Sequence, residues 1–315
     1  MRRSVGLIAI FALSACLPEP ADSIVEPLAA TEWPAPEAIP WGNVSAVDID
    51  SHGHVFVLQR GERVWAEPFP TDPIGHDSVL MFSADGELLA SFGEGELVMP
   101  HGLTVGANDD VYVTDVQREQ VIRFSHDGAL QDAWGERGVS GGDQQHFGRP
   151  ADIAATPDTV LVADGYTNSR IAVFDAEGRF RRQWGVPGDG PNGLNLPHGL
   201  AVREGRVYVA DRENRRIMVY SPEGKPQAQW PLPGHPYAIK PAPDGRIATL
   251  EGRDAEGNAM VFLRLFSQEG ERLGAFKVEG FAGAKGHDFA IAGDGTLYIA
   301  DVEGGRLLTA RLPQH

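Results

Sequence analysis

Three histidines occupy the same place in three copies of a repeated strand motif. His101, His198 and His287 are the second residues of PHGLTV (100–105), PHGLAV (197–202) and GHDFAI (286–291). Imidazole nitrogens are common zinc ligands, and a set of three leaves the open fourth position that a catalytic zinc requires. A single histidine on a strand is more often structural, so the shared position of the three is what predicts a Zn²⁺ site.

The loops after several predicted second strands carry further candidate groups. Arg60 follows HVFVLQ, Tyr166 follows VLVAD with one glycine between, and Arg212 follows VYVAD (207–211). An arginine there can bind a carboxylate through paired hydrogen bonds. A tyrosine close to an arginine and Zn²⁺ can have its pKa lowered enough to act as a base. A structural interpretation, in which Asp and Asn shape these turns and the arginines are solvated, remains open.

A carboxylate stands next to the third histidine. Asp288 follows His287, and Val47 and Leu103 occupy the fourth position of their own strand motifs. Calcium prefers carboxylate and carbonyl oxygens, so Asp288 with the backbone carbonyls of Val47 and Leu103 is a candidate Ca²⁺ site. Asp288 can also orient the neighbouring zinc-binding histidine or cap a turn.

Six copies of a four-stranded unit position these residues. The first strands are VSAVDID (44–50), PHGLTV, PADIAA (150–155), PHGLAV, PYAIKP (236–241) and GHDFAI. Units two to four continue with a strand, a turn containing Gly and a strand ending in Trp. Repeats of roughly 40–55 residues predict an all-β fold, a six-bladed β-propeller with the first strands innermost. Histidines on alternate blades would lie about 120° apart and point to one centre.

Two other all-β folds explain the repeat less well. A β-sandwich has no reason to repeat a first-strand motif six times, and a parallel β-helix has much shorter repeats. The last unit lacks a fourth strand after residues 307–312, so we expect a strand from before Val44 to complete it.

The N-terminus predicts export. An Arg-Arg pair precedes an apolar run over residues 5–13 that is too short to span a bilayer. The run ends in LSAC (13–16), which resembles a bacterial lipoprotein box and predicts lipidation of Cys16. Cys16 is the single cysteine of the chain, so it forms no disulfide within it. An incidental cysteine in an ordinary cleaved signal is the alternative.

These features divide the chain into three parts. Residues 1–15 are the predicted signal peptide, residues 16–43 a Pro-rich tether, and residues 44–315 the propeller. We therefore expect a monomer in the bacterial cell envelope, exported and held to the membrane only by its lipid. A net charge of −17 argues against a nucleic acid partner, which requires a basic surface.

Several sequence blocks resemble the peptidylglycine α-amidating lyase family of NHL-type propellers. They include DSHGHVFVLQRGERVW (50–65), DGYTNSR (164–170) and DRENRRI (211–217), and the resemblance extends from about Val44 to Arg306. It implies cleavage of the C–N bond of a peptidyl- or N-acyl-α-hydroxyglycine, giving an amide and glyoxylate. A separate monooxygenase would make that hydroxylated substrate.

The resemblance also implies residue roles. Zn²⁺ would be bound by His101, His198 and His287, and a structural Ca²⁺ by Asp288 with the carbonyls of Val47 and Leu103. Tyr166 would be the catalytic tyrosine, Arg60 the carboxylate-binding arginine and Arg212 the arginine beside the tyrosine.

The chain departs from the family pattern at two places, and other functions remain open. Thr167 and Gly148 replace cysteines that form a disulfide in the animal lyases, and Lys285-Gly286 replaces Met-Pro before the third histidine. One alternative function is a metal-dependent hydrolase, such as a lactonase, that uses the same propeller mouth. The other is a non-catalytic propeller that binds proteins in the cell envelope.

Overall fold

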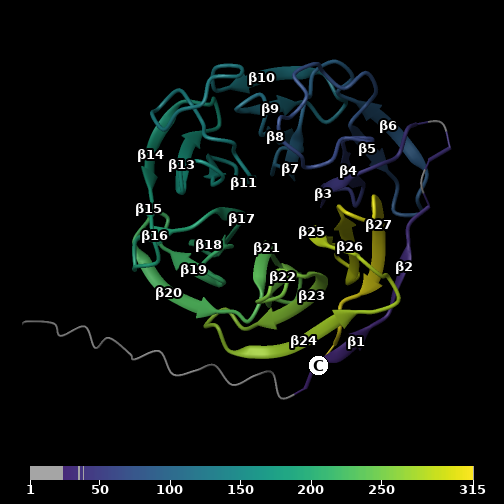
Figure 1. The fold of residues 1–315 in the computed structure, drawn as a ribbon, viewed down its shortest axis with the longest axis vertical. Coiled ribbons are helices and arrows are strands. Elements are labelled where there is room, and N and C mark those ends of the chain that lie inside the picture. Colours follow the sequence, from purple (N-terminus) through teal and green to yellow (C-terminus); the bar gives the residue numbers. More distant parts are fainter. Residues whose placement is uncertain (1–23, 35, 38, 315) are drawn as a thin grey trace, which may run out of the picture.

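Six sheets form a closed ring in the computed structural model of the protein, which describes residues 24–34, 36–37 and 39–314. Figure 1 looks along the axis of the ring, where strands β3, β7, β11, β17, β21 and β25 lie innermost. The prediction of an all-β, six-bladed propeller is confirmed. Within the described residues, no helix has the length and apolar character needed to cross a lipid bilayer.

Each blade is an antiparallel meander, and every innermost strand starts within two residues of its predicted position. Blade 1 contains β3 (Val44–Ile49), β4 (Val55–Gln59), β5 (Val79–Phe82) and β6 (Leu88–Phe92). Blade 2 contains β7 (Pro100–Val105), β8 (Val111–Asp115), β9 (Gln120–Phe124) and β10 (Leu130–Trp134). Blade 3 contains β11 (Asp152–Ala155), β12 (Thr159–Asp164), β13 (Arg170–Asp175) and β14 (Phe180–Trp184).

The second half of the ring repeats this pattern. Blade 4 contains β17 (Pro197–Arg203), β18 (Arg206–Asp211), β19 (Arg216–Tyr220) and β20 (Pro226–Pro231). Blade 5 contains β21 (His235–Pro241), β22 (Ile247–Arg253), β23 (Ala259–Phe266) and β24 (Arg272–Val278). Blade 6 contains β25 (Gly286–Ile291), β26 (Thr296–Asp301) and β27 (Arg306–Arg311). A two-stranded parallel ribbon of β15 (Val186–Pro187) and β16 (Gly193–Leu194) precedes blade 4.

The hydrophobic core lies between neighbouring blades. One cluster joins Phe56 and Leu58 of blade 1 to Val113 and Ile122 of blade 2. Successive strand residues point to opposite faces of a sheet, so a strand buried on both faces has a run of apolar residues, as VFVL (55–58) of β4 does. Because a slip of one residue would exchange the two faces, this burial fixes the strand register and the place of each innermost side chain.

An aromatic ring at the end of one blade packs on a turn glycine of the next. Trp134, the last residue of β10, covers Gly178, where φ is +78° and an added Cβ would lie 2.3 Å from the indole nitrogen. The same contact pairs Phe92 with Gly128, Trp184 with Gly224, Trp230 with Gly270 and Trp33 with Gly86. The aromatic residue that closes the last strand of blades 1 to 4 is therefore a contact between blades.

An N-terminal strand completes the last blade, as predicted. Strand β2 (Ala30–Glu32) pairs antiparallel with β27, with Ala30 opposite Ala310. The hydroxyls of Thr31 and Thr309 lie 3.0 Å apart across this pair. Trp33 follows at once and makes the aromatic contact to blade 1 described above. Strands from the two ends of the chain thus close the ring.

The predicted tether is shorter than residues 16–43. Strand β1 (Glu26–Leu28) pairs parallel with β24 as a fifth strand of blade 5, which the sequence reasoning missed. Strand β2 also precedes the predicted boundary at Val44. Short edge strands tolerate proline, so a Pro-rich composition does not exclude them. The predicted signal peptide and Cys16 lie outside the described residues.

Candidate active site

The three repeated histidines converge at the centre of the ring. His101 lies on β7, His198 on β17 and His287 on β25, in alternate blades. Their ring centroids form a triangle with sides of 4.9, 5.0 and 4.6 Å. One possible ligand atom from each lies within 4.8 Å of the others, and all three residues are buried. The repeat geometry therefore brings together the groups that the sequence pattern selected.

Backbone carbonyls fix the orientation of these rings. His101 Nδ1 donates to the carbonyl of Ala151 and His198 Nδ1 to that of Tyr237, both at 2.8 Å. His287 Nδ1 donates to the carbonyl of Ser45 at 2.6 Å. A carbonyl only accepts, so each Nδ1 carries the proton and each Nε2 presents a lone pair. Each of these carbonyls belongs to the same motif position in the next blade. One repeat position thus supplies both the ring and its support.

Burial keeps the three imidazoles neutral. Burial, with a smaller effect of Arg60, lowers the pKa of His101 to about 3. Burial also lowers the pKa of His198 and His287 well below the usual histidine value. Neutral imidazoles with oriented Nε2 atoms are the form that binds a divalent metal. The three residues therefore fit a zinc ion that keeps an open coordination position.

Tyr166 lies over the histidines, on the loop after β12. Its hydroxyl donates to His101 Nε2 at 2.8 Å and lies 3.2 Å from His198 Nε2. Arg212 Nη1 donates to the same hydroxyl oxygen at 3.3 Å. Burial raises the pKa of Tyr166, and Arg212 opposes this rise only in part. Arg212 by itself therefore does not make Tyr166 a phenolate.

Buried aspartates shape the loops that present Tyr166 and Arg212. Asp164, at the end of β12, accepts hydrogen bonds from Asn168 Nδ2 and Arg170 Nε, each at 2.7 Å. Blade 4 repeats this arrangement with Asp211, Asn214 and Arg216, again at 2.7 Å. The structural interpretation is correct for these Asp and Asn residues. Their role is to hold the loop so that the side chain between them faces the centre.

Arg60 has buried donors without partners. It follows β4 and is 2% exposed, and its Nε and Nη1 atoms have no hydrogen-bond partner among the described residues. Burial lowers the pKa of Arg60 to about 10, against the opposing effects of Tyr166 and Asp115, so the side chain stays charged at neutral pH. A buried cation without an anion is unfavourable, and a guanidinium matches a carboxylate in shape. The free donors therefore indicate a carboxylate site.

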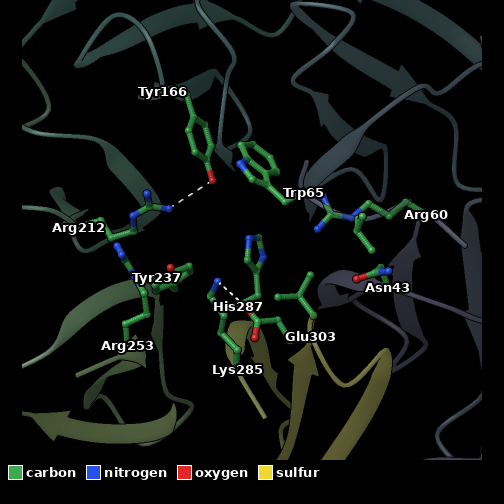
Figure 2. A pocket seen from close by; sticks show the side chains of 12 residues that line it. Asn43, Arg60, Trp65, Tyr166, Arg212, Tyr237, Arg253, Lys285, His287 and Glu303 are labelled. Atoms are coloured by element: carbon green, nitrogen blue, oxygen red, sulfur yellow. Dashed lines mark hydrogen bonds and ion pairs between the residues drawn. The ribbon is translucent and has the colours of Figure 1, made fainter. Parts of the chain in front are cut away.

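Arg60, Tyr166, Arg212 and His287 line one cavity of about 590 Å³ (Figure 2). In Figure 2, Arg60 and Arg212 lie on opposite sides, with Tyr166 above and His287 between them. Trp65 also lines the cavity, and the sequence reasoning missed it. Its ring centroid lies 4.7 Å from that of Tyr166, and the Arg60 guanidinium lies 6.0 Å from it. The sequence feature that could have identified Trp65 is its position as a tryptophan in the polar loop after β4.

The cavity is basic although the protein is acidic. Arg60, Arg212, Arg253 and Lys285 all line it. Arg253 pairs with Glu213 at 2.6 Å, and Lys285 pairs with Glu303 at 2.9 Å, as Figure 2 shows for the second pair. Arg60 is the lining cation whose charge is least balanced. A positive cavity in a protein of net charge −17 concentrates small anions at this mouth.

The candidate calcium site contains a cation of the chain itself. Lys240 Nζ lies 3.6 Å from Asp288 Oδ1, and Val47 N donates to Asp288 Oδ2 at 3.2 Å. Burial raises the pKa of Asp288, and Lys240 opposes that rise. The ammonium therefore already balances the carboxylate that Ca²⁺ would need at Asp288. These residues fit calcium less well than the histidines fit zinc, and the calcium site stays a prediction.

Sequence comparison finds relatives over most of the chain. The chain is 35% identical over 297 residues to a probable peptidyl-α-hydroxyglycine α-amidating lyase of Caenorhabditis elegans. The match covers 86% of this chain and 83% of the relative. It is 33% identical to the peptidyl-glycine α-amidating monooxygenase of Mus musculus, again over 86% of this chain but only 30% of the longer mouse protein. A family profile described as a 6-bladed beta-propeller matches residues 141–248.

Solved structures support the fold. A streptogramin B lyase superposes with a TM-score of 0.57 at 14% identity, covering 90% of this chain and 97% of its own. A chain of a nidogen/laminin complex gives a TM-score of 0.59 at 15% identity, with coverages of 80% and 85%. These likenesses concern the propeller alone. Family membership follows from the closer sequence relatives: the chain belongs to the peptidyl-α-hydroxyglycine α-amidating lyases, which are carbon–nitrogen lyases.

Proposed function

We propose that this protein is a zinc-dependent lyase that cleaves peptidyl- or N-acyl-α-hydroxyglycine into an amide and glyoxylate. The observation that carries the proposal is the buried Arg60, whose unpartnered donors share one cavity with Tyr166 and His287. The Tyr166 hydroxyl in turn contacts the other two histidines, His101 and His198. Such a substrate bears a carboxylate and a hydroxyl on neighbouring carbons. Arg60 suits the carboxylate, and the opposite side of the cavity suits the hydroxyl.

The residues of the chain would each take one part of the reaction. Arg60 binds the carboxylate and thereby orients the carbon that carries both the hydroxyl and the amide nitrogen. His101, His198 and His287 would hold the zinc ion through Nε2. When bound, that ion supplies Lewis-acid stabilisation of negative charge on oxygen. Trp65 packs against the Tyr166 ring and would help to hold it in place.

Tyr166 would take the hydroxyl proton on its phenolic oxygen, with Arg212 donating to that oxygen from the side. As the proton leaves, the C–O bond becomes the carbonyl of glyoxylate and the C–N bond breaks. Its electron pair goes to the nitrogen, which would take the proton back from Tyr166 to give the amide. Because burial raises the pKa of Tyr166 and keeps it a neutral phenol, its function as a base would depend on a cation held by the histidines.

Glyoxylate release from α-hydroxyhippurate tests this assignment. We expect wild-type protein supplied with Zn²⁺ to release glyoxylate, and Tyr166→Phe to lose about 10²–10⁴-fold in kcat. Tyr220→Phe is the matched control, because the Tyr220 hydroxyl is buried and has no partner among the described residues. Full activity of Tyr166→Phe would refute the base. No glyoxylate from the wild type, with turnover of a lactone instead, would favour the metal-dependent hydrolase.

We propose two further features of its setting. The substrate would come from a separate monooxygenase, since several relatives that this chain covers only in part are named as monooxygenases. The protein would be exported and anchored to the cell envelope through Cys16. A Cys16→Ala variant should then leave the membrane fraction, whereas retention there would contradict the anchor.

A further inference from the structure

A second group of metal-binding side chains lies on the opposite face of the ring. It consists of Asp50, His52 and His54 of blade 1 and His126 of blade 2. Asp50 directly follows β3 at the turn to β4, whereas the active-site cavity lies at the other end of β3 beside Asn43. A strand rises about 3.3 Å per residue, so β3 separates the two places by roughly 20 Å. The active-site chemistry proposed above uses none of these residues.

Three imidazoles surround one carboxylate oxygen in this group. Asp50 Oδ2 lies 2.8 Å from His54 Nδ1, 2.8 Å from His126 Nε2 and 3.8 Å from His52 Nδ1. The four possible ligand atoms lie within 4.8 Å of one another. Three nitrogens and one carboxylate oxygen are a set that Zn²⁺ binds in tetrahedral geometry, and Cu²⁺ and Ni²⁺ also favour imidazole.

The carboxylate is held in place by its own turn. Asp50 has a fully buried side chain, and its other oxygen, Oδ1, accepts the backbone N–H groups of His52 at 2.9 Å and His54 at 2.8 Å. Oδ2 is left to face the imidazoles. The Phe56 ring packs edge-on against the His126 ring, with centroids 5.6 Å apart, and so restricts the orientation of that imidazole. Such support positions a ligand set before the ion arrives.

Solvent can reach the group. The side chains of His54 and His126 are 30% and 35% exposed, and that of His52 is 62% exposed. Without an ion, His54 and His126 must both donate a proton to the same oxygen. A divalent cation would replace those two protons and draw in His52 as well.

We propose that Asp50, His52, His54 and His126 form a second divalent transition-metal site, separate from the active site, which links blade 1 to blade 2. Ser51 lies in the same turn and already contacts blade 2 through Asp109, with Oγ donating at 2.9 Å and the backbone N at 3.1 Å. The ion would add a coordinate link at the same junction. Asp109 Oδ2 lies 3.6 Å from His52 Nδ1 and competes for that ring, which makes His52 the weakest of the ligands.

Zinc stoichiometry separates this site from the active site. Purified full-length protein would be dialysed against Zn²⁺ and its metal content measured, together with the lyase activity. We expect two ions in the wild type, one in His101→Ala and one in a His52→Ser/His126→Gln double variant. The double variant should keep its lyase activity, because its substitutions lie on the far face, and its affinity at that face should fall at least about tenfold.

His146→Gln is the matched control. His146 is another histidine that pairs with acidic side chains, Asp143 at 2.8 Å and Glu136 at 3.3 Å, and it lies outside both metal groups. It should retain two ions. Visible absorption with Co²⁺ in His101→Ala gives an independent measure, since a tetrahedral Co²⁺ spectrum is expected there and should disappear when His126 is also replaced. A single wild-type ion that is lost in His101→Ala, or two ions in the double variant, would overturn the proposal.

Discussion

Lys240→Met tests whether a lysine acts as an internal cation of the propeller. Lys240 lies on the innermost strand β21, and its Nζ lies 3.6 Å from Oδ1 of Asp288 on the innermost strand β25. Its side chain is 12% exposed. Burial lowers the pKa of Lys240, but Asp288, Asp48 and Asp152 outweigh this effect and raise it, so the ammonium is held by carboxylates of three other blades.

The magnitude follows from the distance and the burial. At 3.6 Å and an effective dielectric constant of about 20, one pair contributes a gross attraction of about 4.6 kcal/mol. Removing one partner of a buried pair typically costs 3–5 kcal/mol, because the other charge remains buried. Methionine preserves most of the apolar stem. We therefore expect Lys240→Met to lower the free energy of unfolding by about 3 kcal/mol, measured by urea unfolding with tryptophan fluorescence.

The loss should depend on pH and on calcium. Burial raises the pKa of Asp288 above its unfolded value, so the native state binds that proton more tightly and loses stability as pH rises through the folded pKa. Removing Lys240 removes the opposing charge, so the deficit should grow from about pH 5 to about pH 8. Calcium should restore stability to the variant, because it can replace the missing cation among the carboxylates.

Two results would refute this reasoning. Lys225→Met, on an exposed turn of blade 4, should change stability by less than about 0.5 kcal/mol, and an equal loss in both variants would mean that Lys240 has no special role. Stabilisation of the wild type by Ca²⁺, or its destabilisation by a chelator selective for calcium, would show that the ion binds in spite of the lysine. That outcome would favour the predicted site of Asp288, Val47 and Leu103.

Three further predictions concern the carboxylate site, the blade contacts and the closure. Arg60→Met should raise KM for α-hydroxyhippurate about 10–100-fold, the equivalent of one or two charged hydrogen bonds, with no such effect on an analogue whose carboxylate is an amide. Gly178→Ala should cost about 2–4 kcal/mol in urea unfolding, since it adds overlap with Trp134 to the backbone cost at positive φ. Gly138→Ala, at φ +74° with nothing within 4 Å, isolates the backbone cost, and equal losses would exclude the overlap. A chain that begins at Asn43 should melt at lower temperature than one that begins at Ile24, because it lacks β1 and β2; unchanged melting would contradict the closure.

The sequence was most informative where the repeat carries both structure and chemistry. His101, His198 and His287 could be placed together because each occupies the same position of an aligned strand, and the fold repeats by rotation. The same alignment identified Tyr166 and Arg212, which occupy equivalent places in loops held by Asp164 and Asp211.

Features outside the repeat could not be predicted from the sequence. Trp65 lies in a loop that only blade 1 has, so no other unit indicates where it points. Lys240 stands in PYAIKP at a position that looks solvent-facing from alternation alone, and only the three-dimensional ring places carboxylates of other blades around it. Strand β1 pairs with a residue range some 250 positions away, and its three residues carry no periodic pattern.

The closure has a consequence for the order of synthesis. Strand β2 is made before any blade, whereas its partner β27 is made after all the others. Until the chain is nearly complete, β2 has nowhere to pair, and blade 6 then presents an open edge until β2 returns to it. Such an edge accepts any strand of suitable sequence, including β2 of a second nascent chain. Crowded synthesis should therefore favour strand-exchanged pairs of molecules, in which each N-terminus completes the ring of the other.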